Sequence, residues 1–138
     1  MMRAGVSVST AATGVTSTDP LAFLHGYGAR ALLVFAVVLG VWGTYLYFRK
    51  QELSGGFRSS FLIMGGLTAL QGLIGLVAFI TGGRPTELLH LVYGAFAVLF
   101  IPGVYFYAQG GTRRREAVIL AGAAWIVSIA YFRGIATG

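Results

Sequence analysis

The chain has 138 residues, of which 57% are hydrophobic and only 10% are charged, with a net charge of +6. Soluble globular domains carry roughly 25% charged residues, so this composition is that of an integral membrane protein whose length is almost all used by spans. Cysteine is absent, which excludes disulfides, thiolate metal sites and covalent CxxCH haem attachment. The basic residues lie at the ends of apolar segments, where they anchor and orient membrane helices, so the positive charge does not indicate nucleic-acid binding.

The first part of the chain predicts a flexible tail and then a helix start. Residues 1–18 are rich in Ser, Thr, Ala and Gly and contain no apolar run long enough for a signal peptide. Asp19 can cap free backbone N–H groups and Pro20 is preorganised for the first helical position, so we expect a first helix over about 20–50. At about 1.5 Å per residue this helix measures roughly 45 Å, longer than the roughly 30 Å hydrocarbon core, and must tilt or protrude.

A second helix is expected over about 59–81, after a polar link with a break at 55–56. Gln71 is the one strongly polar residue at mid-depth of this helix. If its role is structural, we expect its side chain to hydrogen-bond a neighbouring helix. Small residues recur every three positions and predict a face on which another backbone packs closely: Gly66, Ala69, Gly72 and Gly75.

The remaining length provides two further helices. A turn at 82–85 leads into a third helix over about 86–108, and a basic link at 110–116 leads into a fourth, shorter helix over about 117–133. Four apolar helices joined by short links predict an all-α domain at 19–135, an integral membrane four-helix bundle with up-down-up-down topology.

Basic residues gather in two of the three links. Arg49, Lys50 and Arg58 flank the first link and residues 113–115 are all arginine, whereas the middle link carries Arg84 alone. The positive-inside rule therefore places the two basic links in the cytoplasm. The middle turn and both termini are then external, in what we expect to be a bacterial inner membrane.

The chain has two histidines, His25 and His90, and both lie near the start of a long apolar segment. An ionisable residue in a membrane helix is costly unless it has a partner, so it indicates a functional site. The first and third helices run in the same direction, and each histidine lies about one and a half turns from its expected helix start. Both histidines are therefore expected at one depth near the external face, on helices that are diagonal in the bundle.

Two imidazoles at one depth are suited to binding haem iron, which accepts one or two such ligands and needs no cysteine. Gly28 and Gly94 follow the histidines by three and four residues, on the same helix face, and leave space for a flat ring. Arg30 and Arg84 lie near the same rim and are candidates to pair with haem propionates. The structural alternatives stay open: hydrogen-bonded histidines, packing glycines and arginines that extend to the interface.

Other chemistries lack the necessary residues. A zinc site takes three or four ligands, and besides the histidines only Asp19 and Glu87 are expected on the same side. A proton-coupled transporter needs an acid at mid-membrane, where this sequence has none. No nucleophile with a base and an orienting acid can be assembled, so we do not expect a stand-alone enzyme.

The stretch from Gln71 to Phe100 resembles the haem A synthase family. It has Gln-x-x-x-Gly within one helix, a Thr-Gly exit, a turn with proline, then His-Leu and an apolar run. Proteins of that family are two fused four-helix halves, each with histidine ligands to b-type haem at the outer ends of two helices. The resemblance covers about residues 22–108 and implies that His25 and His90 are the ligands.

The chain departs from that family in two respects. The family has a glutamate three residues before the earlier histidine and an arginine directly after it, whereas this chain has Ala22 and Gly26. Because that glutamate is implicated in the oxidation chemistry of the family, its absence argues against haem A synthesis. The chain also matches one half only, so a second haem site would require a dimer.

The sequence therefore predicts a membrane protein that binds b-type haem through His25 and His90, in electron transfer or as a haem-carrying subunit. Its expected partners are the lipid bilayer and either other membrane redox subunits or a second copy of the chain. The alternative is a cofactor-free accessory or assembly subunit of a respiratory or photosynthetic complex. A small quinone-interacting protein is a third possibility.

Overall fold

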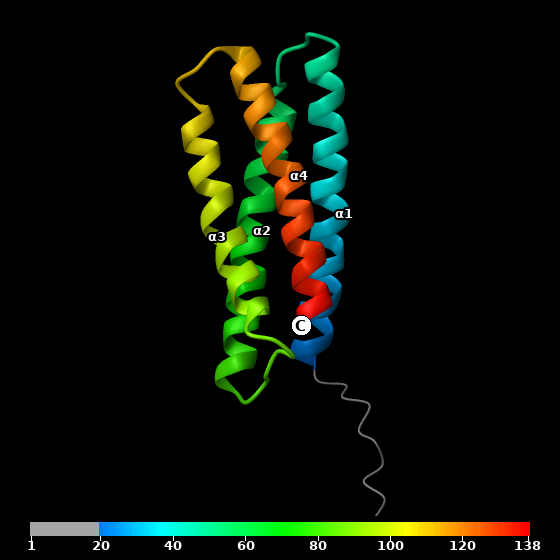
Figure 1. The fold of residues 1–138 in the computed structure, drawn as a ribbon, viewed down its shortest axis with the longest axis vertical. Coiled ribbons are helices and arrows are strands. Elements are labelled where there is room, and N and C mark those ends of the chain that lie inside the picture. Colours follow the sequence, from blue (N-terminus) through cyan, green and yellow to red (C-terminus); the bar gives the residue numbers. More distant parts are fainter. Residues whose placement is uncertain (1–19) are drawn as a thin grey trace, which may run out of the picture.

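The computed structural model describes residues 20–138, which form four helices and no strand. Neighbouring helices run in opposite directions, up-down-up-down, and each is long and apolar enough to span a membrane (Figure 1). This confirms the predicted fold class. The expected tail at 1–18 and the capping residue Asp19 lie outside the described residues. The helices are α1 (Pro20–Phe48), α2 (Gly55–Ile80), α3 (Leu89–Ala108) and α4 (Arg113–Thr137).

Two helices begin earlier than predicted, because hydroxyl side chains cap them. The Ser54 hydroxyl accepts a hydrogen bond from the Phe57 backbone N–H at 3.1 Å, so the two glycines at 55–56 form the first turn of α2 instead of a break. Thr112 accepts one from the Arg115 N–H at 3.2 Å in the same way. Helix α4 is consequently 25 residues long, and the prediction that it is the shorter helix was wrong, since α3 has 20.

Helix α1 ends in a tight reversal centred on Lys50. The Lys50 N–H donates to the Tyr47 carbonyl at 3.1 Å and the Gln51 N–H donates to the Leu46 carbonyl at 2.9 Å, which is the Schellman pattern. Lys50 has a φ of 56°, in the left-handed region where glycine is usual. Phe48 is thus the last helical residue, two residues before the predicted end.

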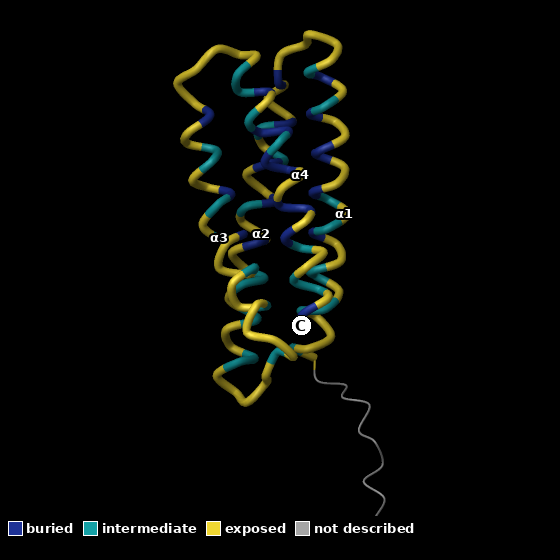
Figure 2. Tube along the Cα trace, viewed as in Figure 1, coloured by how far each residue is buried: buried dark blue, intermediate teal, exposed yellow. Residues whose placement is uncertain are grey.

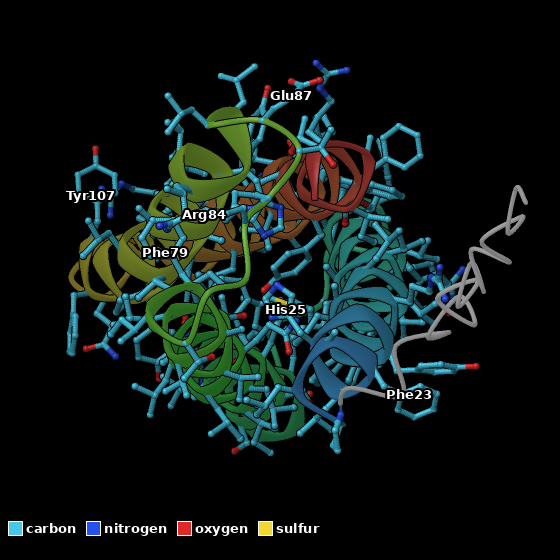
Figure 3. All side chains as sticks on the ribbon, turned by 90° about the horizontal axis from the view of Figure 1, so that it is seen from below. Phe23, His25, Phe79, Arg84, Glu87 and Tyr107 are labelled. Carbon is cyan, nitrogen blue, oxygen red and sulfur yellow. The ribbon has the colours of Figure 1, made fainter. Side chains whose placement is uncertain are left out.

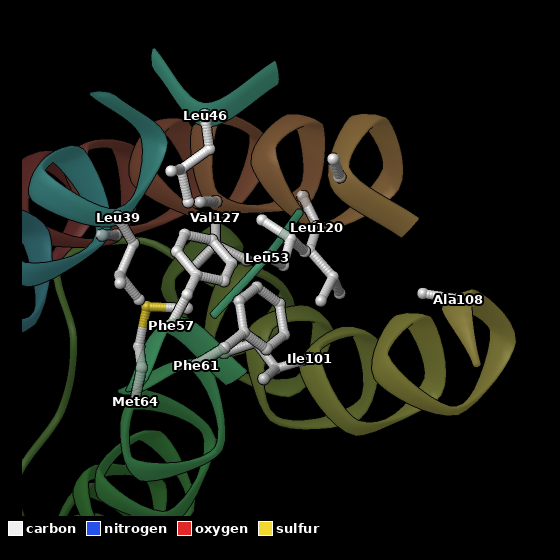
Figure 4. Close-up of a cluster of buried hydrophobic side chains, with 14 of the residues drawn as sticks. Leu39, Leu46, Leu53, Phe57, Phe61, Met64, Ile101, Ala108, Leu120 and Val127 are labelled. Atoms are coloured by element: carbon white, nitrogen blue, oxygen red, sulfur yellow. The ribbon is translucent and has the colours of Figure 1, made fainter. Parts of the chain in front are cut away.

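The four helices surround one apolar core. Helix α1 packs mainly on α2 and α4, and α3 packs on the same two helices, so α1 and α3 are diagonal. The largest fully buried side chains come from every helix and interdigitate (Figure 4): Leu39, Phe57, Phe61, Met64, Ile101, Leu120 and Val127. These residues lie toward the end of the bundle that carries the two basic links.

The opposite end of the bundle is packed less tightly (Figure 2). No residue is buried within 20–31 of α1, 69–80 of α2 or 89–96 of α3, and Thr137 is the only buried residue in the last turns of α4. The histidines lie in this half.

Candidate functional site

The two histidines meet at the end of the bundle opposite the basic links. His25 comes from α1 and His90 from α3, and their Nε2 atoms are 3.4 Å apart. The ring centroids are 5.7 Å apart and the rings are inclined by 65°. Figure 3 shows His25 between the helices, seen from this end. The expectation that the histidines share one depth is confirmed.

The position of His90 within its helix differs from the prediction. Helix α3 begins at Leu89, so His90 is its second residue instead of lying about one and a half turns inside. The segment before it forms a turn in which the His90 N–H donates to the Glu87 carbonyl at 3.1 Å. The Glu87 N–H in turn donates to the Thr137 carbonyl at 3.1 Å, which holds this turn against the end of α4.

The outer nitrogen of each imidazole has a partner on a further helix. The Gln71 amide nitrogen, on α2, lies 3.0 Å from His25 Nδ1 and 2.5 Å from the His25 backbone carbonyl oxygen. His90 Nδ1 lies 2.8 Å from the Gly134 carbonyl oxygen, on α4. All four helices therefore contribute one residue to a continuous hydrogen-bonded chain.

The hydrogen-bond partners of the two imidazoles determine which ring nitrogen of each carries the proton. A carbonyl oxygen only accepts, so the Gln71 atom beside the His25 carbonyl is the NH2 donor, and it also donates to His25 Nδ1. His25 then carries its proton on Nε2 and donates to His90 Nε2, and His90 donates from Nδ1 to Gly134. With both imidazoles neutral, each ring nitrogen in the chain has a partner of the right kind.

Glycines allow the close approach of these side chains. A Cβ on Gly75 would lie 2.8 Å from His25 Cε1, so the His25 ring packs directly on the α2 backbone. A Cβ on Gly28 would clash with Gln71 Oε1, so Gly28 accommodates the glutamine and not the flat ring that we predicted. Gly94 is exposed and a Cβ there would meet nothing within 4 Å, so its role beside a ring stays a prediction.

The small-residue face predicted on α2 is divided between two sides of the helix. Gly72 receives the Val98 side chain, whose Cγ2 would lie 3.0 Å from a Cβ there, and Gly75 receives His25. Gly66 and Ala69 are exposed, and a Cβ on Gly66 would meet nothing within 4 Å. The close contacts at Gly72 and Gly75 are with side chains of the same bundle, and the predicted contact with another backbone was wrong there.

The two arginines proposed for propionates are directed to other partners. The Arg30 guanidinium lies 5.8 Å from the Tyr27 ring centroid, and that of Arg84 lies 4.5 Å from the Phe79 ring centroid. Figure 3 shows Arg84 beside Phe79. Both arginines are exposed. They lie toward the same end as the histidines, as predicted, but neither has a hydrogen bond to them among residues 20–138.

Two histidines match the number of imidazole ligands that haem iron accepts. For His25 Nε2 to bind a metal, its proton would have to move to Nδ1 and the Gln71 side chain would have to turn its amide oxygen toward that atom. Two imidazole Nε2 atoms face each other, and within residues 20–138 no group of three or more His, Cys, Asp or Glu side chains gathers to hold a zinc-type ion. At 3.4 Å the two Nε2 atoms are too close to hold a metal ion at about 2.0 Å from each, so the two side chains would have to separate to bind one. The His90 bond to Gly134 is the backbone contact that commonly orients a ligating histidine.

Two residues of the hydrogen-bonded series that links the four helices, Gln71 and Gly134, were not predicted as site residues from the sequence. Gln71 was noted as a polar residue at mid-depth, and its predicted bond to a neighbouring helix is present. Gly134 acts through its backbone carbonyl, for which the sequence has no signal. Comparison with protein-family models, curated proteins and solved structures finds no match to this chain.

Proposed function

We propose that this protein binds one b-type haem between His25 and His90 and works in electron transfer, alone or as the haem-carrying subunit of a membrane redox complex. The observation that carries the proposal is the pair of Nε2 atoms facing each other at 3.4 Å from diagonal helices. When bound, haem supplies a one-electron carrier, and two imidazole ligands keep its iron low-spin.

The packing of the bundle supports this proposal. The apolar core fills the half near the basic links, whereas the histidine half lacks buried residues on three of its four helices. The side chains of this half can separate at a smaller cost than those of the core, because fewer close contacts are lost.

We further propose a bacterial inner membrane with the basic links in the cytoplasm. Both links lie at one end of the bundle, and the turn with Arg84 lies at the other (Figure 1). The histidine pair is then near the external face, where a haem would exchange electrons with external partners. Other membrane redox subunits, or a second copy of the chain, are the expected neighbours.

The test is a reduced-minus-oxidised visible spectrum with a pyridine haemochrome assay, on detergent-purified protein from a haem-sufficient host. We expect a stoichiometric low-spin b-type signal. His25→Ala and His90→Ala should each abolish it, whereas Thr81→Ala, an exposed change near the same end, should not. A preparation without a Soret band would refute the proposal, and a low-spin spectrum that survives both histidine changes would reassign the ligands.

The second candidate is a cofactor-free accessory or assembly subunit. The observation that favours it is the chain from Gln71 through the histidines to Gly134, which satisfies every ring nitrogen without a metal. Replacing both histidines should then leave the activity of the parent complex intact. Gly66→Leu should disturb association without an internal clash, since a Cβ at Gly66 meets nothing within 4 Å.

A further inference from the structure

A pocket with basic walls lies at the end of the bundle opposite the histidines. It is a partly open pocket of about 270 Å³, bordered by the end of α1, the start of the α1–α2 link and the first turns of α4. Its polar lining consists of Tyr47, Lys50, Gln51, Glu52, Arg113 and Arg114. The pocket is separate from the histidine site and lies at the margin of the apolar core, to which its Ala117 wall belongs.

The charges around this pocket favour an anion. Glu52 is the one acidic residue in its lining, and its carboxylate is paired with Arg113. The Arg114 guanidinium lies 5.1 Å from the Tyr47 ring centroid and donates weakly to its hydroxyl at 3.4 Å. Neither Lys50 nor Arg114 has an ion pair within residues 20–138, so two positive charges remain uncompensated at the pocket.

The backbone at Lys50 gives independent support for a role of its side chain. Its φ of 56° lies in the left-handed region, which favours glycine at this position of a Schellman turn. A lysine held in that conformation costs stability that a glycine would not. Strained residues of this kind concentrate at functional sites, and this one lines the pocket.

An apolar groove continues from the pocket along the surface of α1 and α4. It has a volume of about 230 Å³ and shares Tyr47 with the basic pocket. Its other walls are Thr44, Val118, Ala121, Gly122 and Trp125, from successive turns that lead away from the link and into the spans. A basic pocket at the helix ends and an apolar groove along the helices thus meet at one side chain.

We propose that the pocket and the groove together form a binding site for an anionic phospholipid. The phosphate of the headgroup pairs with Lys50 and Arg114, and one acyl chain lies in the groove beside Trp125. Basic pockets at the ends of membrane helices are known to favour anionic headgroups. A free phosphate would use the pocket and leave the groove empty, so the groove is the reason for choosing a lipid.

Fluorescence quenching by brominated lipids tests this proposal, because Trp125 lines the groove. The Trp42→Phe variant, in which Trp125 is the only tryptophan, is reconstituted in vesicles of phosphatidylcholine with a small fraction of brominated lipid. We expect brominated phosphatidylglycerol to quench Trp125 more strongly than brominated phosphatidylcholine. The matched Trp125→Phe variant, which keeps Trp42 outside the groove, should show equal quenching by both lipids. Equal quenching of Trp125 would overturn the proposal.

Charge variants then identify the headgroup contacts. Lys50→Gly and Arg114→Gln should each lower the preference for the anionic lipid about five-fold, and Arg30→Gln at the opposite end should not change it. Lys50→Gly should not lower the thermal stability in detergent, since it removes the unfavourable φ. An unchanged preference in both pocket variants would refute the assignment. Loss of the preference in millimolar inorganic phosphate, but not in chloride of equal ionic strength, would show a site for free phosphate instead.

Discussion

Gly75→Ala tests whether His25 is held against the α2 backbone. A Cβ at this position would lie 2.8 Å from His25 Cε1, whereas ordinary contacts of a Cβ begin at 3.4 Å. The imidazole must retreat by at least about 0.6 Å, which disturbs its hydrogen bonds to Gln71 and His90. Overpacking of this kind costs about 1–3 kcal/mol, and the better helix propensity of alanine offsets at most about 1 kcal/mol. With the full offset, the expected net loss in the free energy of unfolding is about 0–2 kcal/mol.

A double-mutant cycle with His25→Ala isolates this contact. The measurement is the free energy of unfolding in mixed detergent micelles, followed by circular dichroism, on haem-free protein. Without the imidazole the new methyl group has no neighbour to displace, so Gly75→Ala should cost nothing in that background. The expected coupling energy between the two positions is at least about 1 kcal/mol.

Gly66→Ala is the matched control on the same helix, since a Cβ there meets nothing within 4 Å. It should be neutral or slightly stabilising with or without His25. Equal costs of Gly75→Ala in both backgrounds would refute the reasoning, because the contact with His25 would then not cause the loss.

Two further changes probe the bundle away from the histidines. The Arg58 guanidinium donates to both carboxylate oxygens of Glu116 at 2.6 and 2.7 Å, so Glu116→Gln should lower the free energy of unfolding by about 1 kcal/mol. In a salt titration this difference should shrink as screening increases, and a difference independent of salt would contradict the ion-pair explanation. A Cβ on Gly43 would lie 2.9 Å from the Ala121 Cβ and 3.2 Å from its Cα, so Gly43→Ala must separate two backbones and should cost about 1–3 kcal/mol in the same unfolding assay. Gly103→Ala, where a Cβ meets nothing within 4 Å, is its control, and equal effects of the two changes would refute the packing argument.

The sequence alone determined the number of helices, their topology and the end of the bundle that the two histidines share. Apolar runs long enough to span a bilayer, separated by polar links, predict four helices whatever their neighbours are. Because the first and third helices run in the same direction, His25 and His90 had to reach the same end. Helix ends were predicted less well where a single hydroxyl side chain decides them, as Ser54 does at α2 and Thr112 at α4.

Only the tertiary structure decided which side of each helix faces the bundle. In a soluble helix the apolar side marks the core, but in a membrane the lipid-facing side is apolar as well, so the pattern gives no rotational signal. Packing therefore directed Gln71 over Gly28 and brought the Gly134 carbonyl to His90. A backbone carbonyl has no signature in a sequence, and its role at the site follows from the arrangement of the helices.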